Sequence, residues 1–519
     1  MDRVRNLIFS LIVAMIAAIS CRASDIYIAK TAAGGNTGAD CADAHAMTFF
    51  NAPSNWASTA TSGKVSPGTT VHLCGTFTAP AGSSSYLQFQ GSGISGSPIT
   101  LIFETGATLT APYWSGPAID ANGRSWLIIN GNNTGTIQAT ANGTLLANQQ
   151  DSGIGVGSTM ACSNCTVENL TVSNLYVHAC SGAVSTCTDE GGQNTSGVRF
   201  VQGSNVIISG NTVHDAKWCI LFAYGAPSSG VQISGNTTYN CDHGVVFGDA
   251  SAGSTGSGTI YGNNISNMSN WDDAGDVNHH DGIHDWANFT GSSYTLRIYN
   301  NYLYGNGGAN FNSWIAIEAN GIGSTVFNNV ISMQSNCVGG VGLIGLFTGG
   351  GPNGSGVGIY NNTIRGNGPS DNCVGIGVQS QTGGTAIKNN ITENVGTFTY
   401  IPTSGQIAAS GVNNNVWYNS SNGFWCPGAV EVSFSLWQSS CGFDAQGVNA
   451  NSNLNSTFAP VAGSPAIGAG ANLTPLGLSA LNQDKAGLKR QPPMLPWTAG
   501  AYQASGPSSP TNVTGTATP

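Results

Sequence analysis

The phrase Ile359-Tyr-Asn-Asn362 recurs along the chain in related forms, each with an apolar residue in first place and Asn in fourth. The other copies are Ile208-Ser-Gly-Asn211, Ile233-Ser-Gly-Asn236, Ile260-Tyr-Gly-Asn263, Ile298-Tyr-Asn-Asn301, Val326-Phe-Asn-Asn329, Ile387-Lys-Asn-Asn390 and Val412-Asn-Asn-Asn415. The fourth-place Asn residues are spaced by 25, 27, 38, 28, 33, 28 and 25 residues. Periods of this length indicate a repeat architecture.

Each repeat contains short runs in which apolar and polar residues alternate, separated by Gly or Asn, and helical spacing is absent. Alternation predicts strands. One coil per 25–28 residues with a recurring turn Asn predicts a parallel β-helix, in which equivalent Asn side chains stack and bond to one another. Asn also tolerates a left-handed backbone at a sharp bend. The alternative, a β-propeller, needs about 40–45 residues per blade and fits poorly.

On these residues the chain resembles the right-handed parallel β-helix superfamily that includes the pectate lyases, over roughly residues 24–505. The opening Asp25-Ile-Tyr-Ile and the closing segments Ser464-Pro-Ala-Ile-Gly and Gly500-Ala-Tyr502 carry the same resemblance. It implies an all-β solenoid of roughly 10–12 coils. Residues 24–80 would form the entry coils with a short capping helix within 41–57, and residues 445–505 a C-terminal cap. The superfamily includes lyases, hydrolases, epimerases and adhesins, so the reaction stays open.

The N-terminal segment and the low charge of the chain predict an extracellular protein. Residues 1–23 have a basic start, an apolar run and small residues before a cleavage point, which predicts a signal peptide. Lipid attachment at Cys21 is a second interpretation. Charged residues are only 7% of the chain and the net charge is −10, which argues against nucleic acid as a partner. We expect a secreted monomer without a membrane span after cleavage, and a Ser/Pro/Thr-rich tail over 506–519.

Twelve cysteines remain after Cys21, an even number that favours disulfides in an oxidising compartment. Near neighbours along the chain suggest the pairs Cys41 with Cys74, Cys180 with Cys187, Cys219 with Cys241, Cys337 with Cys373 and Cys426 with Cys441. The remaining two, Cys162 and Cys165, have zinc-like spacing, but no second pair completes a site, so a disulfide is favoured.

Stacking the repeats by arithmetic aligns the strands that begin at Gly197, Cys219, Gly244, Gly282 and Trp314. The next residue of each is predicted to face the coil interior (Val198, Ile220, Val245, Ile283, Ile315). The one after it is predicted to face solvent (Arg199, Leu221, Val246, His284, Ala316). Four of the eight histidines gather in this region: His243, His279, His280 and His284. The sequence therefore predicts a site on one side of consecutive coils.

These residue types suit cleavage of a uronate polymer by β-elimination, which needs a cation opposite the substrate carboxylate, a base and an acid. The candidate catalytic residues are His284, Asp281, His243, Lys217 and Arg199, with His284 or His243 as base. Candidate substrate-binding residues are Trp218, Trp286, His280, Asp242, Glu318 and Trp271, because sugar rings pack on flat aromatic surfaces.

Two other functions remain open: a glycoside hydrolase with paired carboxylates on the same face, and a non-catalytic glycan-binding or adhesin-like β-helix. Calcium is the one cofactor that the sequence suggests, at the clustered carboxylates Asp272, Asp273 and Asp276. Zinc at His280 and His284 is not favoured, because a four-residue spacing puts two ligands together only on a helix and this segment is predicted to be a strand.

Overall fold

The computed structural model describes residues 25–141, 153–158, 160–175, 195–225, 227–268, 279–286, 289, 291–318, 321–335, 337, 341–347, 354–379, 381–490 and 496–504. The predicted signal peptide and C-terminal tail therefore lie outside the described residues, as do Cys21, Cys180, Cys187, Trp271, Asp272, Asp273 and Asp276. No helix in the described part of the chain has the length and hydropathy of a membrane span.

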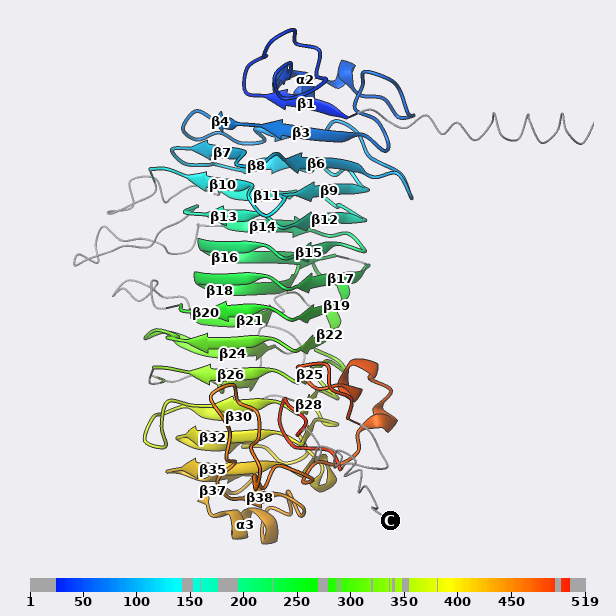
Figure 1. The fold of residues 1–519 in the computed structure, drawn as a ribbon. Helices are drawn as coiled ribbons and strands as arrows, with labels where there is room; N and C mark the ends of the chain where they lie inside the picture. Colours follow the sequence, from blue (N-terminus) through cyan, green and yellow to red (C-terminus); the bar gives the residue numbers. More distant parts are fainter. Residues whose placement is uncertain are drawn as a thin grey trace, which may run out of the picture.

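The chain forms a right-handed parallel β-helix, drawn as a stack of coils in Figure 1. One side is a 14-stranded sheet, here called sheet 1, in which strands one coil apart pair in parallel. In spatial order its strands are β2 (His45–Ala46), β1 (Ile26–Ala29), β3 (Thr70–Cys74), β6 (Ile99–Phe103), β9 (Leu127–Asn130), β12 (Cys165–Glu168), β15 (Ile207–Ser209), β17 (Ser228–Ser234), β19 (Thr255–Tyr261), β22 (Ser293–Tyr299), β25 (Thr325–Phe327), β28 (Gly358–Tyr360), β31 (Ala386–Lys388) and β34 (Val412–Asn413). The 14 strands of sheet 1 indicate slightly more coils than the 10–12 expected.

A 24-stranded sheet forms the other two sides, because the long strands β16 (Thr212–Tyr224) and β18 (Thr237–Asp249) run through both. The side that follows the Asn turn, the Asn face, contains the first halves of these two strands. Its other strands are β4 (Thr76–Thr78), β7 (Thr108–Ala111), β10 (Thr136–Ala139), β13 (Thr171–Ser173), β20 (Asn264–Ser266), β23 (Tyr302–Gly305), β26 (Val330–Met333), β29 (Thr363–Arg365), β32 (Ile391–Val395), β35 (Val416–Ser420) and β38 (Val448–Asn449).

The third side, here called the His face, contains the second halves of β16 and β18. Its other strands are β5 (Leu87–Gln88), β8 (Pro117–Asp120), β11 (Ile154–Ser158), β14 (Ser196–Val201), β21 (His280–Trp286), β24 (Phe311–Ile317), β27 (Ile344–Leu346), β30 (Val374–Val378), β33 (Thr397–Tyr400) and β36 (Phe424–Cys426), with β37 (Ala429–Val432) antiparallel at the end. One continuous apolar core runs between the three sides.

The predicted Asn ladder is confirmed. Nδ2 of Asn301 donates to Oδ1 of Asn329 at 2.9 Å and to the carbonyl oxygen of Ile260 at 2.9 Å, and the same pattern links Asn211 through Asn415. The left-handed backbone, however, belongs to the residue before each ladder Asn, such as Asn300 with φ 57° or Gly235 with φ 64°. That residue turns the chain, and the ladder Asn fills the corner that the turn creates.

Short elements close the two ends of the coil. The expected N-terminal capping helix is α2 (Thr48–Asn51), whose Phe50 is fully buried against Phe89. At the other end α3 (Phe434–Ser439) packs Trp437 on Phe424 at 4.7 Å between ring centroids. Short 3-10 segments lie at Pro53–Asn55, Ala409–Gly411, Thr474–Leu476 and Ser479–Asn482.

The C-terminal segment returns along the side of the lower coils, as the orange and red ribbon of Figure 1 shows. Nδ2 of Asn361 donates to the carbonyl oxygen of Thr498 at 3.0 Å, and Nη2 of the buried Arg490 donates to Oδ1 of Asn328 at 3.1 Å. The predicted C-terminal cap segment thus lies along the flank of the stack, while α3 covers its end.

Five disulfides lie within the described residues: Cys41–Cys74, Cys162–Cys165, Cys219–Cys241, Cys337–Cys373 and Cys426–Cys441. All five match the predicted pairs, including the bond between Cys162 and Cys165. They fit an extracellular protein.

Candidate active site

The predicted alignment of strands on the His face is confirmed residue by residue. Leu221 pairs with Val246, Val246 with His284, and His284 with Ala316. The column predicted to face inward lies in the core: Val198, Ile220, Val245, Ile283 and Ile315.

The neighbouring column points away from the core, but its expected exposure to solvent is wrong. Leu221 is 3% exposed and Val246 is fully buried. Both belong to a small apolar cluster outside the main core, together with Trp218 and the partly buried Trp286. The two indole rings meet edge to face at 5.5 Å, and their large apolar surfaces bury the shorter side chains beside them.

A local break in the strand alternation places His243 and Asp281 on the outer side of the His face, although both are buried there. Cys219 and Ile220 are consecutive, yet both lie in the core, so the residue before Cys219 faces outward. Gly282 is the residue of β21 that corresponds to Cys219 of β16. A Cβ atom on Gly282 would come within 2.6 Å of the Trp314 carbonyl oxygen. Glycine therefore permits the close approach that turns Asp281 outward.

Four side chains from β18, β21 and the residue before β21 converge at one point. Oδ2 of Asp281 lies 3.5 Å from Nε2 of His243, 3.2 Å from Nε2 of His279 and 3.3 Å from Nδ1 of His284. Nε2 of His243 and Nδ1 of His284 are 2.9 Å apart. We call these four residues the His centre; three are buried, while the His279 side chain is 49% exposed.

Each buried member of the His centre has a further polar partner on its far side. Nδ1 of His243 contacts Oδ2 of the buried Asp242 at 2.9 Å. Nε2 of His284 contacts Oε1 of Glu318 at 3.3 Å, and Nδ2 of Asn312 donates to Oδ1 of Asp281 at 3.1 Å. These contacts fix the orientation of all three buried side chains.

The charges at the His centre are tightly coupled. Burial alone would lower the pKa of His243, but Asp242 and Asp281 outweigh it and raise that pKa to about 10. Burial alone would raise the pKa of Asp281, but His284, His243 and His279 hold it far below its usual range. The histidines and the carboxylates of this group therefore stabilise each other's charged forms.

Two predicted cations, Lys217 and Arg199, lie outside the His centre. Lys217 is 6% exposed, and its Nζ lies 5.9 Å from the centroid of the Trp218 ring. Burial alone would raise the pKa of Asp242, but His243, His280 and Lys217 together lower it. Arg199 is three strands from His284 on the same face, about 14 Å at roughly 4.8 Å per strand. It does not join the His centre.

His280 is fully buried, and its Nδ1 lies 3.1 Å from the Gly307 carbonyl oxygen. The pairing of β21 with β24 shifts register between His280 and Asp281. His280 therefore does not follow the alternation of the residues after it on β21. His280 does not join His284 in the group of possible ligands; the structure brings His284 together with His243, His279 and Asp281 instead. The acidic calcium candidates Asp272, Asp273 and Asp276, and the stacking candidate Trp271, remain predictions.

Two features of this face were not predicted. Asn312, on β24, orients Asp281, and nothing in the repeat pattern distinguishes it from the many other Asn residues of the chain. Asp285 pairs with Phe247 and Ile317, both core residues, and is fully buried. Burial, reinforced by Glu318 and Asp249, raises its pKa well above the usual range and so favours the protonated form.

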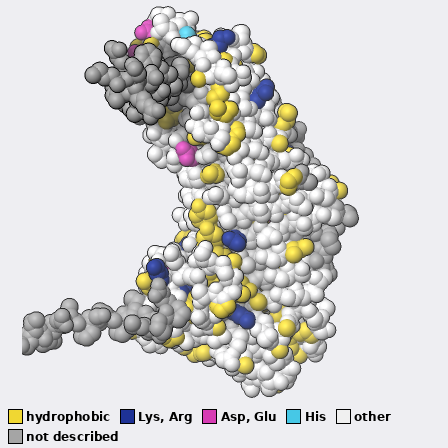
Figure 2. Space-filling model, turned by 90° about the vertical axis from the view of Figure 1, so that its right-hand side faces the viewer, with side chains coloured by type: hydrophobic (Ala, Val, Ile, Leu, Met, Phe, Trp, Pro, Cys, Tyr) yellow, Lys and Arg dark blue, Asp and Glu magenta, His cyan; other side chains and the backbone are white. Residues whose placement is uncertain are grey.

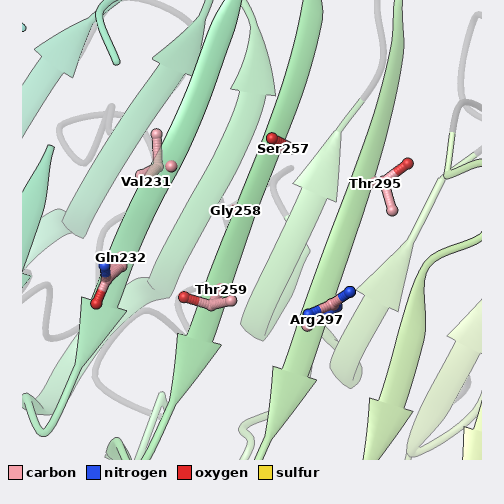
Figure 3. Close-up of a pocket in the computed structure, with 8 residues that line it drawn as sticks. Val231, Gln232, Ser257, Gly258, Thr259, Thr295 and Arg297 are labelled. Atoms are coloured by element: carbon pink, nitrogen blue, oxygen red, sulfur yellow. The ribbon is translucent and has the colours of Figure 1, made fainter. Parts of the chain in front are cut away.

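A separate depression of about 290 Å³ lies on sheet 1, and Figure 3 shows its lining residues on β17, β19 and β22. Small residues such as Ser257 and Gly258 form its floor, and the taller Gln232 and Arg297 stand beside them. Figure 2 shows this side of the molecule as mostly uncharged, with scattered Lys and Arg side chains, a few Asp and Glu, and a concave outline along one edge. Arg297 is exposed, and no carboxylate of the described residues forms an ion pair with it.

No family model matches the chain, and no curated protein does. Among solved structures, pectate lyase Pel9A is 15% identical, with 93% of this chain and 96% of that chain covered and a TM-score of 0.42. A GH136 lacto-N-biosidase from Eubacterium ramulus is 13% identical, with 83% and 67% covered and a TM-score of 0.45. XylC in complex with xylose is 10% identical, with 92% and 98% covered and a TM-score of 0.47. Likenesses this weak carry no argument about the reaction, and the fold rests on the strand pairing.

Proposed function

We propose that the protein is a secreted enzyme that binds an acidic polysaccharide along the His face and cleaves it by β-elimination at a uronate unit. The convergence of His243, His279, Asp281 and His284 carries this proposal. It is a cluster of proton-transfer groups, and one of its imidazoles faces solvent. A uronate presents an anionic carboxylate next to the carbon atom that must lose its proton.

The roles follow from burial and contacts. His284 and His243, the two bases considered from sequence, are buried and have partners at both ring nitrogens, so they form the floor of the site. His279 is the histidine of the centre with an open side, and we assign it the role of proton acceptor. Lys217 adds positive charge beside Asp242.

In this reaction His279 takes the proton from the carbon next to the carboxylate. The electron pair left behind forms a carbon–carbon double bond, the glycosidic carbon–oxygen bond breaks, and the leaving oxygen takes a proton from water. Trp286, partly exposed and 6.3 Å from the His284 ring, offers an apolar surface for a neighbouring sugar. Arg199, further along the same face, is placed to meet another carboxylate of the polymer.

The test is incubation of the purified protein with a panel of uronate-containing and neutral polysaccharides. Ultraviolet absorbance of the unsaturated product and reducing ends are both followed. Unsaturated product that disappears in His279→Ala supports the proposal. Reducing ends without absorbance indicate a hydrolase and contradict it, and absence of both with every polymer also contradicts it.

A second function is glycan binding without catalysis, and the depression on sheet 1 favours it. Arg297 can pair with a carboxylate or sulfate, and Gln232 and Thr259 lie beside it on neighbouring strands for sugar hydroxyls. Affinity electrophoresis in gels containing acidic polysaccharide separates the two surfaces. Retardation lost in Arg297→Ala but kept in His284→Ala places binding on sheet 1, and the reverse pattern places it on the His face.

A further inference from the structure

The structure assigns a divalent metal site, with zinc as its ion, to His243, His279, Asp281 and His284. The proposal rests on the geometry of these residues and holds whether or not the reaction proposed above is correct. The four donor atoms lie within 4.8 Å of one another.

The three donor distances from Asp281 are close to those of a tetrahedral ion, while the two nitrogens of His243 and His284, 2.9 Å apart, would have to separate slightly. With metal–nitrogen bonds of about 2.0–2.1 Å, the ligand atoms of a tetrahedron are about 3.3–3.4 Å apart. The distances from Oδ2 of Asp281 to the three imidazole nitrogens are 3.5, 3.2 and 3.3 Å. Small adjustments would place all four atoms around one centre.

The hydrogen bonding around the His centre is also compatible with a cation between the donors. The contact with Asp242 assigns a proton to Nδ1 of His243, and the contact with Glu318 assigns one to Nε2 of His284. Metal binding would displace the proton that otherwise links these two inward nitrogens, which are 2.9 Å apart, and would leave a lone pair on each of them directed at the centre. Oδ2 of Asp281 adds another lone pair, and it is a buried atom without a conventional hydrogen-bond donor. A single cation satisfies all of these atoms at once.

The outer contacts are those that metal-binding residues commonly have. Histidine ligands usually donate their second N–H to a carboxylate, which fixes the tautomer and the ring orientation. His243 has Asp242 in this role and His284 has Glu318. Asn312 occupies the other oxygen of Asp281 and leaves Oδ2 directed at the centre.

The donor set selects the ion. Calcium and magnesium prefer six or more oxygen ligands, whereas this site offers three nitrogens and one oxygen. Copper(II) favours a planar arrangement, and zinc accepts a tetrahedral set of imidazoles and carboxylate. The exposed His279 is the ligand that a substrate carboxylate can replace. That last step rests on the proposed function: replacement frees the His279 imidazole to accept the proton.

The metal test needs no substrate. The full chain is stripped with a chelator, re-equilibrated separately with Zn²⁺, Cu²⁺, Ni²⁺ and Ca²⁺, and its bound metal is measured by mass spectrometry. Binding of Co²⁺ is followed by visible absorption. We expect one zinc per chain and a tetrahedral cobalt spectrum. Stoichiometry near zero, an octahedral spectrum, or preference for calcium would overturn the proposal.

Variants locate the ion. His284→Ala should abolish stoichiometric binding, and Glu318→Gln should weaken affinity by about 10–100-fold while keeping the fold. His72→Ala is the matched control, since His72 also lies beside a carboxylate, with Nδ1 2.6 Å from Glu104, but outside the His centre. Equal zinc binding by wild type, His284→Ala and Glu318→Gln would place the ion elsewhere and refute the assignment. Zinc binding without activity on any polymer would refute only the proposed function.

Discussion

Nε2 of His243 lies 2.9 Å from Nδ1 of His284, although 41 residues separate the two in the chain. The contact exists because β18 and β21 are neighbours on the His face, with His243 paired to Asp281 and Val246 paired to His284. One coil of the β-helix therefore converts a long separation in sequence into direct contact. The chemistry proposed for this protein depends on that stacking.

His284→Ala should lower the rate of polysaccharide cleavage by at least about 100-fold, the range in which loss of electrostatic stabilisation acts. The substitution removes a buried ring that joins His243, Asp281 and Glu318. The check is the initial rate of unsaturated-product formation, with His72→Ala as control. Similar rates in the two variants would remove His284 from the site.

His279→Ala should leave a bound metal in place but lower turnover by about 10²–10⁴-fold, as expected for loss of a general base. Its side chain is 49% exposed, whereas those of His243, Asp281 and His284 are buried and can hold an ion as three ligands. Metal content and turnover are measured on the same preparation. Loss of metal together with activity would show that His279 is a fixed ligand.

Asn301→Ala should lower the free energy of unfolding by about 2–5 kcal/mol, because buried polar groups lose their partners. Asn301 donates to Asn329 and Ile260, and its Oδ1 accepts from Nδ2 of Asn263 at 2.9 Å. Denaturant unfolding of this variant should be compared with that of Asn449→Ala, an exposed control. Equal stability of the two variants would mean that the ladder contributes little.

Asp444 should make the free energy of unfolding decrease as the pH is raised from about 4 to about 6. Burial raises its pKa from 3.8 to about 6, although Trp417 and Asn415 donate hydrogen bonds to it. In this range the folded state keeps a proton that the unfolded state releases, so rising pH favours unfolding. Two pKa units correspond to about 3 kcal/mol.

The measurement for Asp444 is the difference in unfolding free energy between wild type and Asp444→Asn as a function of pH. The difference in unfolding free energy should change by about 3 kcal/mol between pH 4 and pH 6, and it should not change further above pH 6. A difference that does not vary with pH would show that Asp444 titrates normally in the folded protein.

Much of the fold follows from residues near one another in the repeat. The Asn residues predict the coil and its ladder, and alternation predicts which residues of each strand enter the core. The disulfide pairs could be predicted because their cysteines are close along the chain, as for Cys219 and Cys241. The gathering of His243, Asp281 and His284 also followed from stacking alone.

Burial and orientation could not be predicted in this way. Alternation shows which side of a strand a residue occupies, but not that Trp218 and Trp286 bury that side. Alternation also gives the wrong side of the strand after two successive residues that both face inward, such as Cys219 and Ile220, and after the shift in pairing register beside His280. Each of these exchanges the inward and outward positions that follow.

By itself the sequence determined a coil with stacked, equivalent strands, because each repeat encodes its own turn and its own apolar residues. Only the tertiary structure decided that four donor atoms meet at one point, with Asp242, Glu318 and Asn312 behind them. Such convergence depends on side-chain directions and distances of a few ångströms between coils. Spacing along the chain does not contain that information.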